Sequence, residues 1–165
     1  MTDDELRATV QRLEARVAAL EDQVALYQLI SSYGPAVDSG SADAVAAIWT
    51  EDGTYDTFPA PLNGRDAIRA MVVGDGHQGL IRGGCAHVMA MPMVSVEGDR
   101  ATATGYSRVY VHGDDGFGVW RASANRWEFE RGADGWHAVH RLNRALDGDD
   151  EARQILRDGI ADRTA

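Results

Sequence analysis

The second half of the chain alternates strand-like stretches with short turns rich in glycine and aspartate. We expect strands over residues 85–96, 100–112, 117–131 and 135–146, joined by the turns EGDR, HGDDG and RGADG. Glycine and aspartate adopt the backbone angles that tight hairpins need. The pattern therefore predicts a long antiparallel meander, and it limits the fold to architectures in which one sheet dominates.

The first half of the chain has the periodicity of helices instead. A first helix is expected over residues 5–30 and continues towards Asp38. A second short helix begins after Ser41, which is placed to cap it, and ends at Trp49. The stretch NGRDAIRAMVVG predicts a third helix, GDGHQGLIRGG predicts a loop, and a short strand is expected over residues 54–58.

This order of elements predicts the α+β class. Helices come first and the meander follows, so a bent antiparallel sheet can wrap around the N-terminal helices. Such a sheet forms a cone with one open end, which is a natural pocket for a ligand. We expect three segments: an N-terminal heptad helix over residues 1–24, the cone domain over 25–147, and a C-terminal helix or tail over 148–165.

The N-terminal helix carries a narrow apolar stripe. Its members are separated by alternating steps of four and three residues: Leu6, Val10, Leu13, Val17, Leu20, Val24 and Tyr27. This is the spacing of a coiled coil over about three heptads. The stripe docks either on a partner chain or on the outside of its own domain. We expect a homo-oligomer in any case, because the outer face of a bent sheet is usually covered, and the alternation of valine and leucine favours two strands.

Composition restricts the partners and the compartment. The chain has 165 residues, enough for one domain with a sizeable core, and a formal net charge of -10. The charge argues against nucleic acid and anionic membranes, which would be repelled. One cysteine cannot form an internal disulfide, and the acidic N-terminus does not resemble a signal peptide, so we expect the cytoplasm. The sequence contains no motif for a metal or a cofactor, and we expect neither.

One histidine interrupts an apolar, strand-like stretch, CAHVMAM over residues 85–91. Read with the two-residue period of a strand, Cys85, His87 and Met89 share one face. A buried imidazole costs free energy unless its nitrogens are hydrogen-bonded. His87 is therefore either a core residue bonded to the backbone or part of a functional site.

Three stretches resemble the SnoaL-like branch of the nuclear transport factor 2-like superfamily, which has the cystatin-like α+β fold. They are YGPAVDSGSADAVAAIWTEDGTYD, GRDAI and RGADGWHAVHRLN, and the resemblance covers about residues 25–146. Members include dehydratases, an isomerase, a dehydrochlorinase, polyketide cyclases, non-catalytic binding proteins and oxygenase small subunits, so the resemblance implies the fold more strongly than the reaction. The chain is most similar to scytalone dehydratase, bile-acid dehydratase and lindane dehydrochlorinase, and the dehydratases suggest a trimer rather than a dimer.

The resemblance implies an acid/base dyad. In these enzymes an aspartate at the end of the first long helix pairs with a histidine on the strand after the third helix, and Asp38 and His87 occupy these places. A carboxylate fixes the tautomer of such a histidine and raises its pKa, whereas burial opposes this, so we expect a base poised near neutral pH. The alternative role for Asp38 is to stabilise the turn that follows it.

The resemblance also implies groups that hold the substrate. Tyr33 and Tyr55 match tyrosines of the dehydratases, and each would donate a hydrogen bond to a substrate oxygen. The further candidates for substrate binding are Asn125, His112, Cys85 and Met89. Each candidate also has an ordinary structural role: tyrosine, cysteine and methionine fill cores, asparagine bonds the backbone, and a histidine beside a turn is exposed.

These residues lead to a cofactor-free lyase as the first hypothesis. It would catalyse a dehydratase-type elimination on a small hydrophobic cyclic substrate with a carbonyl and a β-leaving group, with His87 as the base. The alternatives are a polyketide or terpenoid cyclase or isomerase with the same pocket, and a non-catalytic ligand-binding or assembly subunit. Thr57 stands where ketosteroid isomerase has its general base, and a threonine cannot abstract a carbon-bound proton, which counts against that chemistry.

Overall fold

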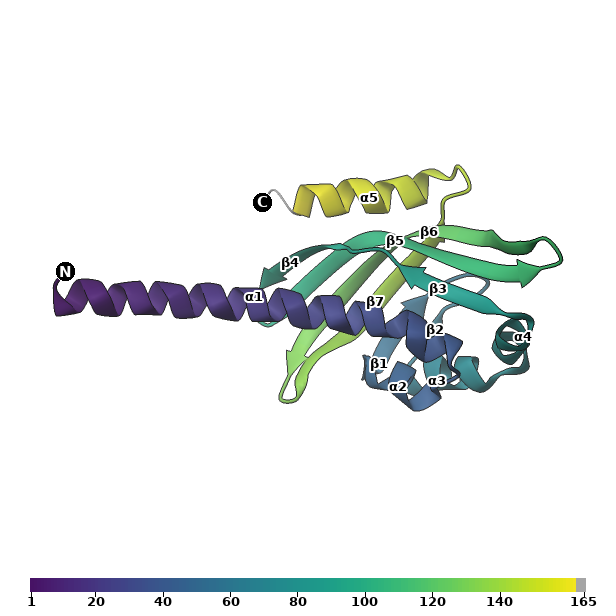
Figure 1. Cartoon of the computed structure of the whole chain (residues 1–165), viewed down its shortest axis with the longest axis horizontal. Coiled ribbons are helices and arrows are strands. Elements are labelled where there is room, and N and C mark those ends of the chain that lie inside the picture. The colour runs from purple at the N-terminus through teal and green to yellow at the C-terminus, as the bar shows by residue number, and fades with distance from the viewer. Residues whose placement is uncertain (163–165) are drawn as a thin grey trace.

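One curved sheet organises the fold in the computed structural model, which describes residues 1–162 (Figure 1). Along the chain the elements are α1 (Asp3–Asp38), α2 (Ala42–Ala47), β1 (Trp49–Asp56), β2 (Leu62–Asn63), α3 (Arg65–Val73), α4 (Asp75–Gly83), β3 (Cys85–Met89), β4 (Met93–Glu97), β5 (Arg100–Gly113), β6 (Gly116–Gly132), β7 (Gly135–Ala145) and α5 (Asp150–Asp162). The predicted α+β class is confirmed.

The sheet has the strand order β2-β1-β7-β6-β5-β3, and β4 also pairs with β5. Neighbouring strands are antiparallel except β1 and β7, which run parallel, so the sheet is not wholly antiparallel as expected. The register of β5 and β6 shifts between Val109 and Tyr110, and the register of β6 and β7 shifts between Glu128 and Phe129. Such irregularities bend a strand, and they curve the two long hairpins of this sheet.

The expected strand over residues 85–96 is two strands, β3 and β4. Pro92 lies between them and has no N–H group to donate to a neighbouring strand. Gly105 of β5 faces this gap, because a Cβ atom there would lie 3.1 Å from the Cα atom of Pro92. The proline thus divides one edge of β5 between two short partners.

The expected loop GDGHQGLIRGG is mostly the helix α4. Its glycines disfavour a helix, but His77 is buried and its Nε2 lies 2.8 Å from the carbonyl oxygen of Val37. This tertiary contact outweighs the local preference. Similarly, β1 begins at Trp49 rather than at Thr54, because Trp49 is completely buried and pairs with Ala138 of β7.

Helices cover opposite faces of the sheet (Figure 1). The C-terminal half of α1 packs on the concave face, in a core that includes Leu26, Ile30, Val37, Trp127 and Phe129. The helix α5 packs on the convex face through a smaller cluster of Ala124, Ala152 and Ile155. The convex face, for which we expected a second subunit as cover, is therefore partly covered by the chain itself.

The N-terminal half of α1 projects away from the domain (Figure 1). Thr2 and Glu5 form a capping box at its start, and its buried residues begin only at Leu26. Where the helix leaves the domain, Asp22 accepts hydrogen bonds from Arg131 at 2.6 and 2.7 Å. The expected boundary between residues 24 and 25 thus falls inside one continuous helix. No helix within the described residues has the length and apolar character to cross a membrane.

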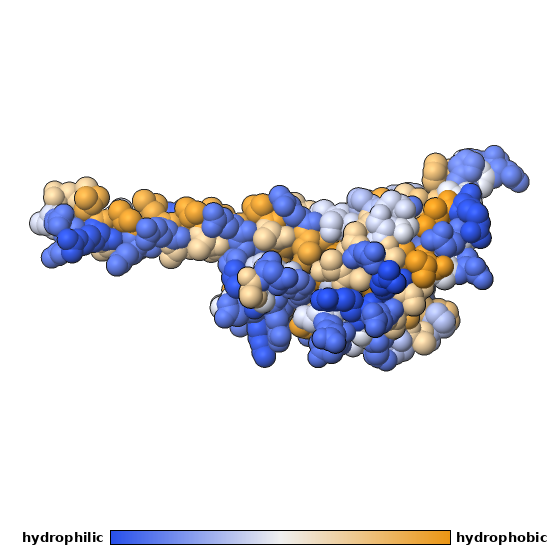
Figure 2. Space-filling view, turned by 90° about the horizontal axis from the view of Figure 1, so that it is seen from below, coloured by the Kyte–Doolittle hydropathy of each residue, from blue (hydrophilic) through white to orange (hydrophobic). Residues whose placement is uncertain are grey.

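The apolar stripe of α1 remains on the surface. Its members from Leu6 to Val24 are between 43% and 60% exposed. Figure 2 shows hydrophobic side chains gathered along one edge of the projecting helix. Of the two expected alternatives, docking of the stripe on the outside of its own domain is wrong.

A glycine lets α1 approach β3 closely. A Cβ atom on Gly34 would collide with the backbone carbonyl oxygen of His87, and backbone cannot rotate away as a side chain can. The contact between helix and strand that brings Asp38 to His87 therefore requires a residue without a side chain at position 34.

We expect Gly34→Ala to destabilise the protein by about 1–3 kcal/mol, because overpacking forces the backbones of α1 and β3 apart. Gly79→Ala is the matched control: it lies inside α4, its Cβ atom would meet no atom within 4 Å, and alanine favours a helix by up to about 1 kcal/mol. Urea unfolding measures both changes. Equal stability of the two variants would show that the approach of α1 to β3 is not tight.

Candidate active site

The carboxylate of Asp38 joins the end of α1 to β3. Its Oδ2 accepts a hydrogen bond of 2.7 Å from the backbone N–H of His87, and its Oδ1 lies 2.6 Å from Nδ1 of the same residue. The thiol of Cys85 donates a longer bond of 3.5 Å to Oδ1. Asp38 and His87, which the sequence analysis pairs, are thus in direct contact.

This contact determines the tautomer of His87. Nδ1 faces a carboxylate and carries the proton, so the lone pair of the neutral ring is on Nε2. The His87 side chain is 12% exposed and that of Asp38 is 22% exposed, so solvent still reaches the pair. His87 therefore has the arrangement of a general base oriented by a carboxylate.

Burial lowers the pKa of His87 below its ordinary value, and this outweighs the Asp38 carboxylate, which raises it. The positive charge of Arg141 and the ring of His77, whose centroid is 5.6 Å away, lower the pKa further. We expected the carboxylate and burial to balance near neutral pH, whereas burial prevails. The imidazole is therefore uncharged at pH 7 and ready to accept a proton.

Cys85 is a protonated thiol rather than a nucleophilic thiolate. Burial and the neighbouring Asp38 raise its pKa to about 11. Potential ligand atoms of Asp38, Cys85 and His87 all lie within 4.8 Å of one another, as in a metal site. In this structure the three groups bond one another instead, because Asp38 accepts hydrogen bonds from the Cys85 thiol and from two N–H groups of His87.

Arg141 of β7 is a site residue that the sequence analysis missed. It is only 2% exposed, and its Cζ atom lies 4.4, 4.6 and 4.3 Å from the ring centroids of Tyr33, Tyr55 and Trp127. The aromatic faces stabilise its charge. Its NH1 atom is buried and has no hydrogen-bond partner within the described part of the chain. An unpaired buried N–H group is costly, so this atom marks a position for an oxygen of a ligand.

Asn125 holds Arg141 in place. Its Oδ1 accepts hydrogen bonds of 3.0 and 2.8 Å from Arg141 and one of 2.7 Å from Asn143, while its Nδ2 donates to Ser107 at 2.8 Å. The amide that we expected to bind substrate is thus engaged within the protein. Met89 also contacts Arg141, with Sδ 3.9 Å from NH2.

The two tyrosines lie against the guanidinium of Arg141. Tyr33 and Tyr55 are buried, with ring centroids 6.4 Å apart. Burial raises the pKa of Tyr33, and the neighbouring Tyr55 raises it further, so Tyr33 keeps its proton and can donate it in a hydrogen bond. Burial acts in the same direction on Tyr55, but the charges of Arg141 and Arg121 outweigh it and lower the pKa of Tyr55.

His112 lies apart from these residues. It is exposed near the tip of the β5–β6 hairpin, where its ring packs edge-on against Phe117 at 5.2 Å. The structure therefore gathers Asp38, His87, Cys85, Tyr33, Tyr55, Asn125 and Met89 on the concave side of the sheet and leaves His112 outside. A signal for Arg141 exists in the sequence, since Arg141 and Asn143 share one face of the last strand, but an alternating polar face ordinarily reads as exposed.

A cavity of about 880 Å³ opens beside this group of residues. Asn143 and Arg121 line its inner wall, and Phe58 and Trp120 are exposed at its rim. Because Asn143 donates to Asn125, which in turn holds Arg141, the cavity reaches the hydrogen-bond network of the interior. The cavity thus adjoins the interior through Asn143, and its lining residues do not include His87, Arg141 or the two tyrosines.

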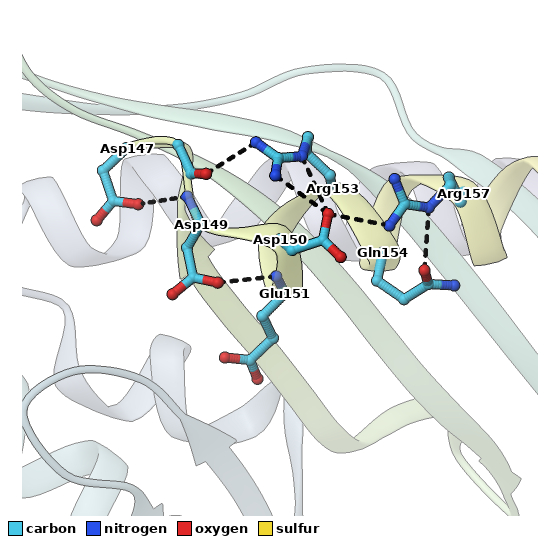
Figure 3. Close-up of polar contacts among 8 residues, drawn as sticks. Asp147, Asp149, Asp150, Glu151, Arg153, Gln154 and Arg157 are labelled. Carbon is cyan, nitrogen blue, oxygen red and sulfur yellow. Dashed lines mark hydrogen bonds and ion pairs between the residues drawn. The ribbon is translucent and has the colours of Figure 1, made fainter.

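The loop before α5 forms the outer wall of the cavity. Figure 3 shows that Asp147 and Asp149 accept hydrogen bonds from the backbone N–H groups of Asp149 and Glu151 at 3.2 and 3.0 Å. These carboxylates satisfy donors at the start of the helix. Each of these carboxylates is thus held by a hydrogen bond close to it in the chain, and it keeps its negative charge.

Replacement of Asp38 by Asn should lower the pKa of His87 further. In the wild type this pKa already lies below its ordinary value, and the carboxylate is the group that raises it. NMR titration of the histidine ring protons measures the shift, with His87→Gln to assign the resonance. Asp134→Asn, beside His137 on the surface, is the matched control and should leave His87 unchanged. A higher pKa in Asp38→Asn would contradict the contact.

The comparisons with known proteins agree with this architecture. The profile of the SnoaL-like domain matches residues 18–151. A solved protein from Novosphingobium aromaticivorans, described as NTF2-like with a cystatin-like fold, is 45% identical, with a TM-score of 0.86 over 88% of this chain and 96% of that one. A search of curated proteins finds no match.

Two further structures from the same organism are similar over most of their length. One, provisionally assigned as an aromatic ring hydroxylase, is 28% identical with a TM-score of 0.60, over 77% of this chain and 90% of that one. The other, provisionally assigned as a scytalone dehydratase, is 17% identical with a TM-score of 0.66, over 78% and 86%. The second likeness concerns the fold alone. On the match over residues 18–151, the chain belongs to the SnoaL-like domain family.

Proposed function

We propose that this protein is a lyase that eliminates water from a small cyclic carbonyl compound without a cofactor. The observation that carries the proposal is the contact of 2.6 Å between Asp38 and Nδ1 of His87, which leaves Nε2 as the basic nitrogen. Dehydratases are among the enzymes of this family's wider superfamily, as are isomerases and cyclases. The aromatic interior supports a hydrophobic ring as the substrate.

The proposed reaction uses the interior groups in two steps. Nε2 of His87 takes the proton from the carbon next to the carbonyl, and the electron pair moves onto the carbonyl oxygen to form an enolate. Arg141, through its unpartnered NH1, and the Tyr33 hydroxyl stabilise that negative charge. The enolate then re-forms the carbonyl, the carbon–oxygen bond at the β-position breaks, and the imidazolium returns the proton to the leaving hydroxide as water.

The uncharged state of His87 supports this assignment. A base must be unprotonated to act, and the lowered pKa keeps His87 in that state at neutral pH. Asp38 would stabilise the imidazolium while it holds the substrate proton. The single cysteine cannot form an internal disulfide and so suits a reducing compartment, and we expect the reaction in the cytoplasm.

We expect His87→Gln to lower kcat/KM by about 10²- to 10⁴-fold, the usual contribution of a general base, with the fold intact by circular dichroism. A panel of cyclic β-hydroxy ketones such as 3-hydroxy-1-tetralone is the assay, and loss of one water in the product mass is the readout. His137→Gln, which removes a partly buried histidine beside Asp134 and outside the proposed site, is the control.

The outcomes separate the reaction classes. Turnover of His87→Gln close to that of the wild type would exclude His87 as the base. A product of unchanged mass would replace elimination by isomerisation or cyclisation with the same acid/base pair. If no ketone of the panel reacts and none binds, a catalytic role for this interior loses its support.

A further inference from the structure

Arg121 of β6 is a cation without a counter-ion among the described residues, and it lines the cavity. The structure gives it no hydrogen bond or ion pair with the residues that it describes, and its Nε is buried and unpartnered. Its guanidinium lies 5.5 Å from the ring centroid of Trp120. In a chain with a net charge of -10, carboxylates are plentiful, so an unpaired and partly buried arginine indicates a position for an external anion.

The carboxylates that share the cavity do not neutralise Arg121. Asp56 and Glu151 both pair with Arg144, at 3.0 and 2.8 Å. Asp149 accepts a hydrogen bond from the backbone of Glu151 in α5, and Asp147 accepts one from the backbone of Asp149 just before that helix, as Figure 3 shows. No carboxylate among the described residues pairs with Arg121, so its guanidinium remains available for a ligand.

Arg121 and His87 face the same interior at a defined separation. Both pair in register with Val109, one on each side of it, so their side chains point to the same face of the sheet. Two strand spacings place their backbones about 10 Å apart. Arg121 also helps to lower the pKa of Tyr55 against the effect of burial, so its charge reaches the interior.

We infer that Arg121 binds a carboxylate of the substrate, which is therefore a cyclic carbonyl compound with an acidic group about one ring away from the reacting carbon. Arginine suits this role because its planar fork holds a carboxylate by two hydrogen bonds. The inference rests on the proposed function for the reacting end of the substrate, and on Arg121 alone for the acidic end.

Binding of 4-acetylbenzoate and of its neutral amide, 4-acetylbenzamide, tests the inference by calorimetry. Both carry a carbonyl and lack a leaving group, so neither can undergo elimination. We expect the acid to bind the wild type more tightly than the amide. Arg121→Gln should lower the affinity for the acid by roughly 10- to 100-fold and change the affinity for the amide by less than about twofold. Arg108→Gln is the matched control, since Arg108 is the exposed neighbour of Val109 on β5.

Three outcomes would overturn the inference. The wild type would bind the acid and the amide with equal affinity, it would not bind the acid at millimolar concentration, or Arg121→Gln would lower the affinity for both compounds equally. If Arg121→Gln unfolds, Arg121→Lys replaces it: the charge remains, the fork is lost, and the acid should weaken by a smaller factor. If the protein prefers the acid but eliminates water from no substrate, this inference stands and the proposed lyase activity is rejected. If it eliminates water but does not prefer the acid, the lyase activity stands and this inference is rejected.

A different observation carries a second inference, on the projecting half of α1. The stripe places valine at one seam position, in Val10, Val17 and Val24, and leucine at the other, in Leu6, Leu13 and Leu20. All are about half exposed, and the other residues of the helix as far as Glu21 are exposed too, except the half-buried Thr9. An isolated helix of this length is marginal in water, so the stripe requires a partner.

The charges beside the stripe favour a second copy in parallel. In a parallel pair, the residue just before a valine of the seam faces the residue five positions later on the partner helix. Arg16 would thus face Glu21 of the second copy, twice in a symmetric pair, and the other flanking pairs contain no like charges. A fully overlapping antiparallel pair would instead bring Arg16 towards its own copy. We infer that residues 3–27 form a parallel two-stranded coiled coil between two copies of this chain.

Sedimentation equilibrium of the full chain tests this second inference. We expect a dimer that Leu13→Asp dissociates and that Ala15→Asp, on the opposite side of the helix, leaves intact. Arg16→Glu should raise the dissociation constant of the dimer by roughly tenfold, since like charges then face each other. The double variant Arg16→Glu/Glu21→Arg should restore the wild-type constant. A monomeric or trimeric wild type, or a dimer that tolerates Leu13→Asp, would overturn the inference.

Discussion

The contact between Asp38 and His87 is the constraint on which the interior depends. Asp38 ends α1, where the negative end of the helix dipole disfavours a carboxylate. Two N–H groups of His87, one from the backbone and one from the ring, compensate for this position. The same bonds attach the helix to β3 and orient the imidazole, so one interaction serves both the packing of the domain and the proposed chemistry. Gly34 makes it possible, because only a residue without a side chain allows the two backbones to meet.

Arg141 is the second feature that organises the interior. It carries a positive charge into the core of an acidic protein and has no carboxylate within bonding distance among the described residues. Three aromatic faces and the amide of Asn125 stabilise it instead. A carboxylate partner would have cancelled the charge, whereas neutral partners leave it available. This is why the concave face can favour a negative transition state even though the chain as a whole is negative.

The features that the sequence predicted best are local ones. The hairpin turns around Gly98, Gly116 and Gly135 have positive φ angles that glycine adopts readily, and the strands β5, β6 and β7 run close to their expected lengths. The helix α4 was missed because its glycines argue for a loop, while the stabilising bond from His77 goes to a carbonyl 40 residues away. The pKa of His87 was misjudged for a similar reason: the sequence shows that a carboxylate is available but not how much water the fold removes.

The sequence by itself determined the class of fold, the order of helices first and meander last, the seam on α1 and the residues that meet at the end of that helix. These follow from hydrophobic periodicity, turn chemistry and family resemblance, all of which are written along the chain. Only the tertiary structure decided that Arg141 enters the core, that Arg121 stays unpaired in the lining of the cavity, and that the seam remains exposed. A strand presents its side chains alternately to two faces, and which face is enclosed depends on how the sheet curves over helices that lie far away in the sequence.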